Sequence, residues 1–353
     1  MDKTPYLNLV KSIEPANKYI GLEESLDFQA QLLGAWERQQ RILGYAEASI
    51  TLNIRSVQEF LKISGVFIWK ITKVDLDLFY ETLIGKRLSH SSRRKYQSAI
   101  AIFLDYLRSR HGTEIWQRYQ IAVPNVLDKF NRYVHRKDDG NEVVTPPRPE
   151  VLDKFWAYMK QEMSTARKPA TIARDYALYR VLELAGLRVN EAVQLDMKDC
   201  RFDLGTKGKI HVRFGKGSMG AGPKKRWVPI MDELEQLLQW YIEHIRVLFP
   251  HSKDGPLFLA EDGKRIKRDT VRGTLRRRQR AWGFSEDEIF SPHQFRHAYA
   301  SRLTQKGVDL YTLKELLGHV SPTTTLNYVK ASTDYLEMRV RLSQDHWRNS
   351  LQE

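Results

Sequence analysis

A histidine and a tyrosine stand nine residues apart in the stretch LLGHVSPTTTLNYVK, residues 316–330. Gly318 follows an apolar helical pattern, and glycine commonly ends a helix because it tolerates the left-handed conformation. Ser321, followed by proline, suits the N-cap of a second helix. The pattern therefore predicts His319 on a fixed turn and Tyr328 on the third turn of the next helix.

Tyr328 is a candidate nucleophile toward phosphorus. A phenolate is a better leaving group than an alkoxide, so a phosphotyrosine intermediate can be reversed without ATP. The pKa of a free tyrosine is about 10, so a neighbouring group must take the proton. The alternative is a helix-turn-helix in which Tyr328 packs on Leu326 or contacts DNA.

The stretch SPHQFRHAYASRL, residues 291–303, has clear signals for the start of a helix. Ser291 is the expected N-cap, and Gln294 completes a capping box. His293 and Arg296 then lie one turn apart on one face, at the end of the helix that favours a phosphate. The alternative is a surface salt bridge.

A second arginine is expected where a backbone turn fixes its side chain, because two guanidinium groups could bind the oxygens of a phosphodiester. In AGLRVNEAV, residues 185–193, Arg188 follows a helix stop and Glu191 lies three residues further on. We expect Glu191 to orient Arg188. The alternative is an ordinary surface ion pair between these two residues.

A lysine on a hairpin turn could protonate a 5' hydroxyl as it leaves. The alternating stretch KIHVRFGKG and the return strand KRWVPI predict such a hairpin, with Ile210, Val212 and Phe214 on one face. Lys216 is the candidate. Lys224 and Lys225, across the turn, are rivals, and a solvated lysine is the alternative.

The composition favours a nucleic acid as partner. The chain has 353 residues and 57 lysines and arginines against 43 aspartates and glutamates, a net charge of +14. One cysteine, Cys200, excludes a disulfide framework or a cysteine-based zinc site. No apolar run approaches the roughly 20 residues needed to cross a bilayer. We therefore expect a cytoplasmic protein with no membrane partner.

The length predicts two domains. Four helical patterns fill residues 25–110, and the last of them has Arg93, Arg94 and Lys95 in its first turn. Cations there oppose the helix dipole, so they are expected to meet an anion; the alternative is a solvated charged end. A charged, proline-rich stretch then predicts a linker, and a mixed but mostly helical region follows it.

The ordered set of Arg188, a hairpin lysine, His293 with Arg296, His319 and Tyr328 resembles the tyrosine site-specific recombinases, the class of phage integrases and Xer recombinases. The motifs GLRVNE, HQFRHAYA and LLGHVSPTTTLNY carry the resemblance, which covers roughly residues 148–335. The hairpin GKGSMGAGPKKRWVPI departs from the family, because it is longer by several glycine-rich residues. That departure leaves Lys216, Lys224 and Lys225 open as the catalytic lysine.

The resemblance implies a two-domain DNA clamp, mainly α-helical with a small antiparallel β-sheet. An N-terminal extension (1–24) would precede a helical core-binding domain (25–125), a linker (126–147) and a catalytic domain with a C-terminal tail helix (148–353). The tail, 332–353, could pack on its own domain or on a neighbouring protomer.

The resemblance also implies a role for each site residue. Tyr328 would form a 3' phosphotyrosine, Arg188 and Arg296 would bind the phosphate, and His293 would act in proton transfer at the tyrosine. His319 would hydrogen-bond a non-bridging oxygen, and Lys216 would protonate the leaving hydroxyl. The family needs neither metal nor ATP, which agrees with a sequence that has no cysteine cluster, HExxH or P-loop.

The basic run KRIKRDTVRGTLRRRQR, residues 264–280, is interpreted in this light as a surface that tracks phosphates. The candidate contacts in it are Lys264, Arg265, Lys267, Arg268, Arg276, Arg277 and Arg278. The expected partners are double-stranded DNA with a specific recombination site, further copies of the chain in a tetramer, and accessory directionality proteins.

The predicted function is recombination through a Holliday junction, for integration, excision or transposition of a mobile element. The alternatives are Xer-like dimer resolution, a type IB topoisomerase and a non-catalytic helix-turn-helix regulator.

Overall fold

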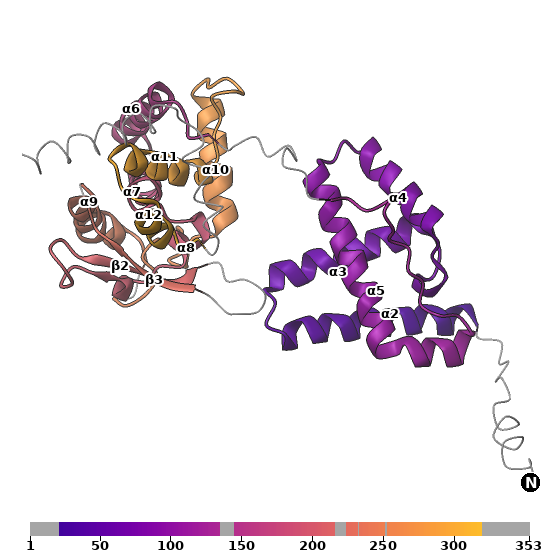
Figure 1. Cartoon of the computed structure of the whole chain (residues 1–353). Helices are drawn as coiled ribbons and strands as arrows, with labels where there is room; N and C mark the ends of the chain where they lie inside the picture. Colours follow the sequence, from indigo (N-terminus) through magenta and orange to yellow (C-terminus); the bar gives the residue numbers. More distant parts are fainter. Residues whose placement is uncertain (1–20, 135–144, 216–223, 232, 251–252, 320–353) are drawn as a thin grey trace, which may run out of the picture. The chain divides into compact units, whose positions relative to one another are not determined.

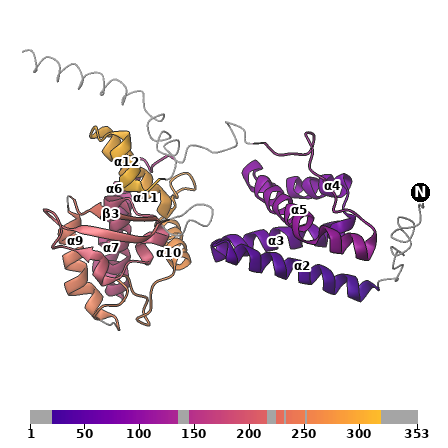
Figure 2. The same cartoon turned by 60° about the horizontal axis from the view of Figure 1, so that its bottom comes forward.

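A computed structural model describes residues 21–134, 145–215, 224–231, 233–250 and 253–319 of the chain. Contacts divide the chain into two compact units, Met1–Asn141 and Glu142–Glu353, called here the N-terminal and C-terminal units. Figures 1 and 2 show the N-terminal unit from indigo to purple and the C-terminal unit from magenta to yellow. Within the described ranges, no helix is both long and apolar enough to span a membrane.

The N-terminal unit is built from helices packed on one apolar core. Its helices are α2 (Leu22–Ile42), α3 (Glu47–Ser64), α4 (Lys73–Gly85) and α5 (His90–Tyr119), with a short 3₁₀ turn, η1 (Ile68–Lys70). One large aromatic ring from each of the four α-helices is fully buried: Trp36, Phe60, Phe79 and Phe103. The four helical patterns predicted from the sequence are therefore confirmed, although α5 extends nine residues beyond the predicted end at Arg110.

The N-terminal unit extends further along the chain than the sequence indicated. Val123 and Val126 are buried in its core, and the ring of Tyr133 packs against that of Tyr80 at 4.7 Å between centroids. The side-chain amide of Gln97 donates to the Tyr133 carbonyl at 3.2 Å. The predicted start of the linker at residue 126 is therefore too early, because these apolar side chains are needed to complete the helical core.

The C-terminal unit combines helices with a small sheet, which confirms the predicted fold class. Its α-helices are α6 (Pro149–Thr165), α7 (Pro169–Ala185), α8 (Val189–Val193), α9 (Leu234–Trp240), α10 (Arg268–Ala281), α11 (Pro292–Gln305) and α12 (Leu310–Leu317). Short turns occur at η2 (Met197–Asp199), η3 (Tyr241–Ile245) and η4 (Arg246–Leu248). The strands β1 (Cys200–Arg201), β2 (Lys209–Gly215) and β3 (Lys224–Pro229) pair antiparallel in the order β1-β2-β3.

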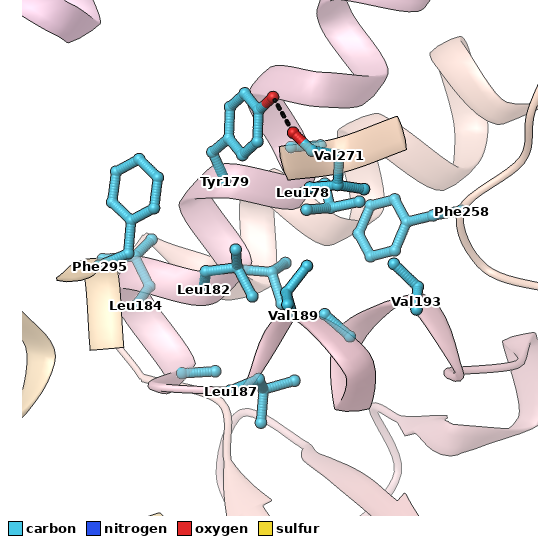
Figure 3. Close-up of a cluster of buried hydrophobic side chains, with 14 of the residues drawn as sticks. Leu178, Tyr179, Leu182, Leu184, Leu187, Val189, Val193, Phe258, Val271 and Phe295 are labelled. Carbon is cyan, nitrogen blue, oxygen red and sulfur yellow. Dashed lines mark hydrogen bonds between the residues drawn. The ribbon is translucent and has the colours of Figure 1, made fainter. Parts of the chain in front are cut away.

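Helix α7 is the centre of this unit, and Figure 3 shows some of its buried side chains with those that pack around them. Leu178, Tyr179 and Leu182 are fully buried. The ring of Tyr179 stacks on Phe295 of α11 at 5.8 Å, and its hydroxyl donates to the Val271 carbonyl of α10 at 3.3 Å. The core thus fixes α10 and α11 around α7, and these helices carry basic and catalytic candidates.

The hairpin differs from the prediction at one residue. Ile210 and Val212 are buried as predicted, but Phe214 is 43% exposed. Val212 pairs with Arg226 and Gly215 with Lys224, so β2 has one more residue than β3 between the two pairs. This bulge turns Phe214 away from the core face. A Cβ on Gly215 would lie 2.2 Å from the Lys224 carbonyl oxygen, so the close approach there requires glycine.

Gly186 ends α7 in the left-handed conformation, with φ of 62°. A Cβ at this position would lie 2.3 Å from Cδ1 of Tyr299, whose ring is buried. We expect Gly186→Ala to lower the free energy of unfolding by about 2 to 4 kcal/mol, through backbone strain and overpacking. Urea unfolding followed by circular dichroism would measure the loss.

Gly273 of α10 supplies the control for this substitution. A Cβ there would meet nothing within 4 Å. Gly273→Ala should stabilise the protein by about 0.4 to 1 kcal/mol, because alanine restricts the unfolded chain and suits a helix. Equal effects of the two substitutions would contradict the account of Gly186.

Candidate active site

The first feature of the site is a turn that fixes an arginine. Arg188 follows the left-handed Gly186 by two residues and directly precedes α8. The backbone N–H of Arg188 donates to Glu191 Oε2 at 2.9 Å, and its Nη1 donates to Oε1 at 2.7 Å. The Arg188 side chain is 23% exposed, whereas that of Glu191 is 1% exposed. The pair is therefore no surface ion pair, because the buried Glu191 carboxylate accepts from both the backbone and the side chain of Arg188.

Glu191 lies among three arginines. Nη1 and Nη2 of Arg226 donate to Oε1 and Oε2 of Glu191 at 3.0 and 2.8 Å, and Nη1 of Arg296 lies 3.8 Å from Oε2. Burial alone would raise the pKa of Glu191, but the hydrogen bonds and charge of Arg226, with the charges of Arg296 and Arg188, lower it to about 2. The carboxylate is therefore ionised throughout the neutral range, and the cluster keeps a net positive charge.

Arg296 of α11 connects the ends of two other helices. Its Nη1 donates to the Gly186 carbonyl after α7 at 2.7 Å, and its Nη2 donates to the Leu317 carbonyl at the end of α12. Carbonyls at helix C-termini lack partners within their own helix, so the guanidinium satisfies both. Arg296 is fully buried, which rules out the surface salt bridge considered for it. Of the two predicted phosphate ligands, Arg188 thus has the side chain that is more exposed to solvent.

Arg226 was missed by the sequence analysis. It belongs to β3, its side chain is 7% exposed, and its Nε donates to the Leu316 carbonyl at 2.9 Å. Strand alternation could have indicated it, because Val228 is buried and residues 226 and 228 share one face of β3. Its pairing with Glu191, 35 positions earlier in the chain, is visible only in three dimensions.

The start of α11 agrees with the sequence prediction. Ser291 is the N-cap, Pro292 is the first residue of the helix, and the Ser291 N–H donates to Gln294 Oε1 at 2.8 Å. His293 is exposed on the first turn, and its ring contacts that of His297 at 4.7 Å in an edge-to-face arrangement. Partial desolvation, with the charges of Arg296, Arg188 and Arg272, lowers the pKa of His293. A neutral imidazole at this position can accept a proton.

His319 follows the predicted helix stop. Leu313 and Leu317 of α12 are buried, and Gly318 is left-handed with φ of 63°. His319 is buried, and its N–H donates to the Lys314 carbonyl at 3.1 Å. Burial, then the charges of Arg296, Arg188, Arg226 and His293, lower the pKa of His319 to about 3. The structure therefore brings Arg188, Arg296, His293 and His319 within electrostatic reach of one another.

The neutral state of His319 predicts a loss of stability on acidification. An imidazole in the unfolded chain has a pKa of about 6.5. The folded chain binds this proton more weakly, so stability is lost as the pH falls from about 6.5 toward the lowered folded value. His297, whose pKa burial and its neighbours His293 and Arg296 lower to about 4, adds to the loss in the same window.

The thermal unfolding midpoint tests this expectation. Between pH 7 and pH 5 the wild type should lose about 4 °C more than His319→Asn, which has no titrating side chain at this position. If the thermal midpoints of the two proteins fell equally with pH, His319 would not be a buried neutral imidazole.

Tyr328 and Lys216 lie outside the described residues, so the structure does not place them. The rival lysines are both on β3. Lys224 shares the face of Arg226, whereas Lys225 shares the opposite face with Trp227, which is 43% exposed. Lys224 is therefore on the Glu191 side of the sheet, and Lys225 points away from it.

The basic run at 264–280 divides into exposed and structural residues. Lys264, Lys267, Arg268, Arg276 and Arg277 are exposed. Arg278 is buried, and its Nη1 donates to Asp175 Oδ2 at 2.7 Å. The prediction of Arg278 as a phosphate contact is wrong, because its guanidinium is enclosed by the core that surrounds α7.

Arg265 is half-buried, and its Nη1 donates to the Val193 and Leu195 carbonyls at 2.8 and 3.0 Å. Its Nη2 donates to Asp196. These contacts at the end of α8 indicate a structural role. Arg272, exposed on α10, lies near enough to His293 for its charge to contribute to the lowered pKa of that imidazole.

Arg93, Arg94 and Lys95 lie in the first turns of α5, in the N-terminal unit. The guanidinium of Arg93 lies 5.2 Å from the centre of the Tyr133 ring. Arg94 and Lys95 line a cavity of 460 Å³ together with Arg132. The cavity concentrates positive charge at one place on this unit, which suits an anionic ligand.

A metal centre finds no support in the described part of the chain, where no group of three or more histidine, cysteine, aspartate or glutamate side chains could hold an ion. Cys200 is buried, and burial raises the pKa of its thiol to about 12.

The chain is similar to known proteins over most of its length. A sequence profile of the Phage integrase family matches residues 154–334. Tyrosine recombinase XerC of Leptospira interrogans is 29% identical over 285 residues, 78% of this chain and 86% of that protein. Tyrosine recombinase XerD of Staphylococcus epidermidis is 29% identical over 275 residues, 77% of this chain and 85% of that protein.

Solved structures share the fold. A XerH site-specific recombinase, in a post-cleavage complex with a palindromic difH substrate, superposes with a TM-score of 0.65 at 24% identity, covering 90% of this chain and 85% of that one. The integrase of transposon Tn1549, bound to transposon right-end DNA, has a TM-score of 0.59 at 19% identity, with coverage of 90% and 98%.

Proposed function

Because the chain belongs to the phage integrase family, whose members are tyrosine recombinases that break and rejoin DNA, we propose that it recombines DNA at a specific site through a 3' phosphotyrosine on Tyr328. The observation that carries the proposal is the cluster of Arg188, Arg226 and Arg296 around Glu191. The positive charge of this cluster can stabilise a phosphodiester and its transition state. The two neutral histidines beside it include a group that can accept the proton of the tyrosine.

Each group has a role in the proposed reaction. Arg188 binds a non-bridging oxygen, and Arg296 adds charge and fixes the ends of α7 and α12. His293, exposed beside Arg188 and Arg296, transfers the tyrosine proton. His319 hydrogen-bonds a non-bridging oxygen. The bond between phosphorus and the 5' oxygen breaks as the bond between phosphorus and the Tyr328 oxygen forms. Lys216, or Lys224 in its place, protonates the leaving 5' oxygen.

The exposed cations on α10 extend the site along a duplex. In the described ranges, Arg276 and Arg277 form no ion pair with a carboxylate. Replacing both with glutamine should reduce the slope of log affinity against log salt by about 2, because each lost phosphate contact removes about one released counterion. Fluorescence anisotropy between 50 and 300 mM salt, roughly the range in which such contacts are sensitive, gives the slope.

Arg278→Gln is the control for this change. It removes a cation from the same helix, but one that is buried against Asp175. It should lower the thermal midpoint and leave the salt slope of the folded protein unchanged. A slope that falls equally in both variants would contradict the division of the basic run.

The biological role that we propose is the integration, excision or transposition of a mobile element, by a tetramer that holds two duplexes. One comparison in favour is the fold shared with a transposon integrase. Dimer resolution is the second candidate, favoured by the XerC and XerD relatives that match over more than three quarters of this chain. The exposed cations of both units would contact the duplex, and accessory directionality proteins would bias the outcome.

The proposed function is tested with the full-length protein on genomic and element DNA. Covalent protein–DNA complexes trapped by denaturation are sequenced to find the site, which is then placed twice on a supercoiled plasmid. We expect deletion or inversion between the two copies. Relaxation of any plasmid without recombinant products would instead indicate a topoisomerase, and binding without covalent complexes would indicate a DNA-binding regulator.

A further inference from the structure

Arg226 contacts several elements that carry functional groups of the site. From β3 it reaches Glu191 of α8 with two hydrogen bonds and the last turn of α12 with a third. We infer that Arg226 is a positioning residue, which occupies the Glu191 carboxylate and thereby leaves the Arg188 side chain and the charge of Arg296 to act on the phosphate. The inference rests on the proposed function, because it assumes that these two arginines bind or stabilise the scissile group.

The arginines around Glu191 compete for one carboxylate. Glu191 Oε1 accepts from Arg188 at 2.7 Å and from Arg226 at 3.0 Å, and Oε2 accepts from Arg226 at 2.8 Å. Arg296 Nη1 lies 3.8 Å from Oε2, beyond hydrogen-bond distance. A buried carboxylate that loses a bidentate partner must find other compensation. Arg188 and Arg296 are the nearest cations, so Glu191 would bind Arg188 more closely and neutralise more of the charge of Arg296.

Arg226 also contacts the turn that bears His319. Arg226 Nε donates to the Leu316 carbonyl at 2.9 Å. Gly318 lies against the same side chain, since a Cβ there would approach both Cδ and Nη1 of Arg226 to 3.0 Å. Arg226 therefore holds α12 at a fixed distance from α8. Through this contact it sets where His319 lies relative to Arg188.

A purely structural arginine in the same unit provides a matched control. Arg174 donates through Nε and Nη2 to Asp175 at 2.9 and 2.7 Å, and through Nη1 to the Leu259 carbonyl at 2.9 Å. Its side chain is 7% exposed, the same fraction as that of Arg226. Both arginines thus join a buried carboxylate to a backbone carbonyl, but the carboxylate is Asp175 for Arg174 and Glu191 for Arg226. If Arg226 were merely structural, substitutions at the two positions would behave alike.

The test compares rates of covalent-adduct formation on a nicked suicide duplex that carries the recovered site. The full-length variants are R226M, E191Q, R226M/E191Q, R174M and R174M/E191Q. R226M should slow the reaction about 100-fold, as expected for loss of preorganisation at a charged site. R226M/E191Q should react about tenfold faster than R226M, because a neutral amide binds Arg188 less closely and does not neutralise the charge of Arg296. R174M/E191Q should be no faster than R174M.

Recovery in the double variant is a readout that a general loss of stability would not produce. A rate for R226M/E191Q equal to or below that of R226M, while the wild type forms adducts, overturns the inference and leaves the proposed function intact. A wild type that forms no adduct on any DNA overturns the proposed function and the inference with it.

Thermal unfolding shows whether R226M is folded and can be compared with R226M/E191Q. If R226M shows no cooperative transition, the comparison is made between R226K and R226K/E191Q. Lysine keeps the charge but cannot form the bidentate contact, so the recovery should be smaller, about threefold. No recovery in that background also overturns the inference.

Discussion

Tyr328→Phe should abolish covalent attachment of the protein to a nicked suicide duplex. Phenylalanine lacks the oxygen that attacks phosphorus, and no other described side chain near Arg188 is a comparable nucleophile. The adduct on denaturing gels should fall below about 10⁻⁴ of the wild-type amount at equal time, the scale seen when a nucleophile is removed. Affinity for the same duplex, measured by anisotropy, should stay within about threefold, because a single hydroxyl contributes little to a large charged interface.

Tyr311→Phe is the control for this substitution. Tyr311 lies on the first turn of α12 and is 71% exposed. Removing its hydroxyl should leave both adduct formation and DNA affinity unchanged. If the adduct persisted in Tyr328→Phe and disappeared in Tyr311→Phe, Tyr328 would not be the nucleophile.

Arg296→Gln should have the second largest effect, on activity and stability together. The change removes the charge next to Glu191 and the two hydrogen bonds to the carbonyls of Gly186 and Leu317. We expect the rate of adduct formation to fall about 10³-fold, as for loss of a buried group that stabilises transition-state charge. The free energy of unfolding should fall by about 3 to 5 kcal/mol, because a buried ionic network loses one member. Single-turnover kinetics and urea unfolding measure the two effects.

Arg302→Gln separates the effect on the site from the effect on the helix. Arg302 is on α11 too, and its Nη2 donates to the Glu183 carbonyl at 3.3 Å. Its loss should cost about 1 kcal/mol of stability and leave the rate of adduct formation within about twofold. An equal loss of rate in both variants would mean that Arg296 acts only by stabilising α11.

Local backbone signals were the most predictable part of the fold and the site. Gly186 and Gly318 end α7 and α12 in left-handed conformations, and Ser291 with Gln294 caps α11. Each depends on residues within a few positions of one another, so the sequence alone could indicate it. These three positions place Arg188, His319 and His293.

Contacts between distant segments were not predictable in the same way. Arg226 joins Glu191 across 35 positions, and Arg278 joins Asp175 across 103. The sequence pattern around a basic residue on an amphipathic helix is the same whether the residue contacts a phosphate or a buried carboxylate. For this reason the pattern placed Arg278 on the DNA surface. The bulge that exposes Phe214 depends on the register between β2 and β3, which alternation within one strand cannot specify.

In the proposed reaction, this chain cuts DNA by attaching Tyr328 to a 3' phosphate. The most direct measurement is mass spectrometry of the covalent complex after digestion with protease and nuclease. We expect one modified peptide, which contains Tyr328 linked to the 3' phosphate of a nucleotide at the mapped site. A link to another residue, or to a 5' phosphate, would contradict it.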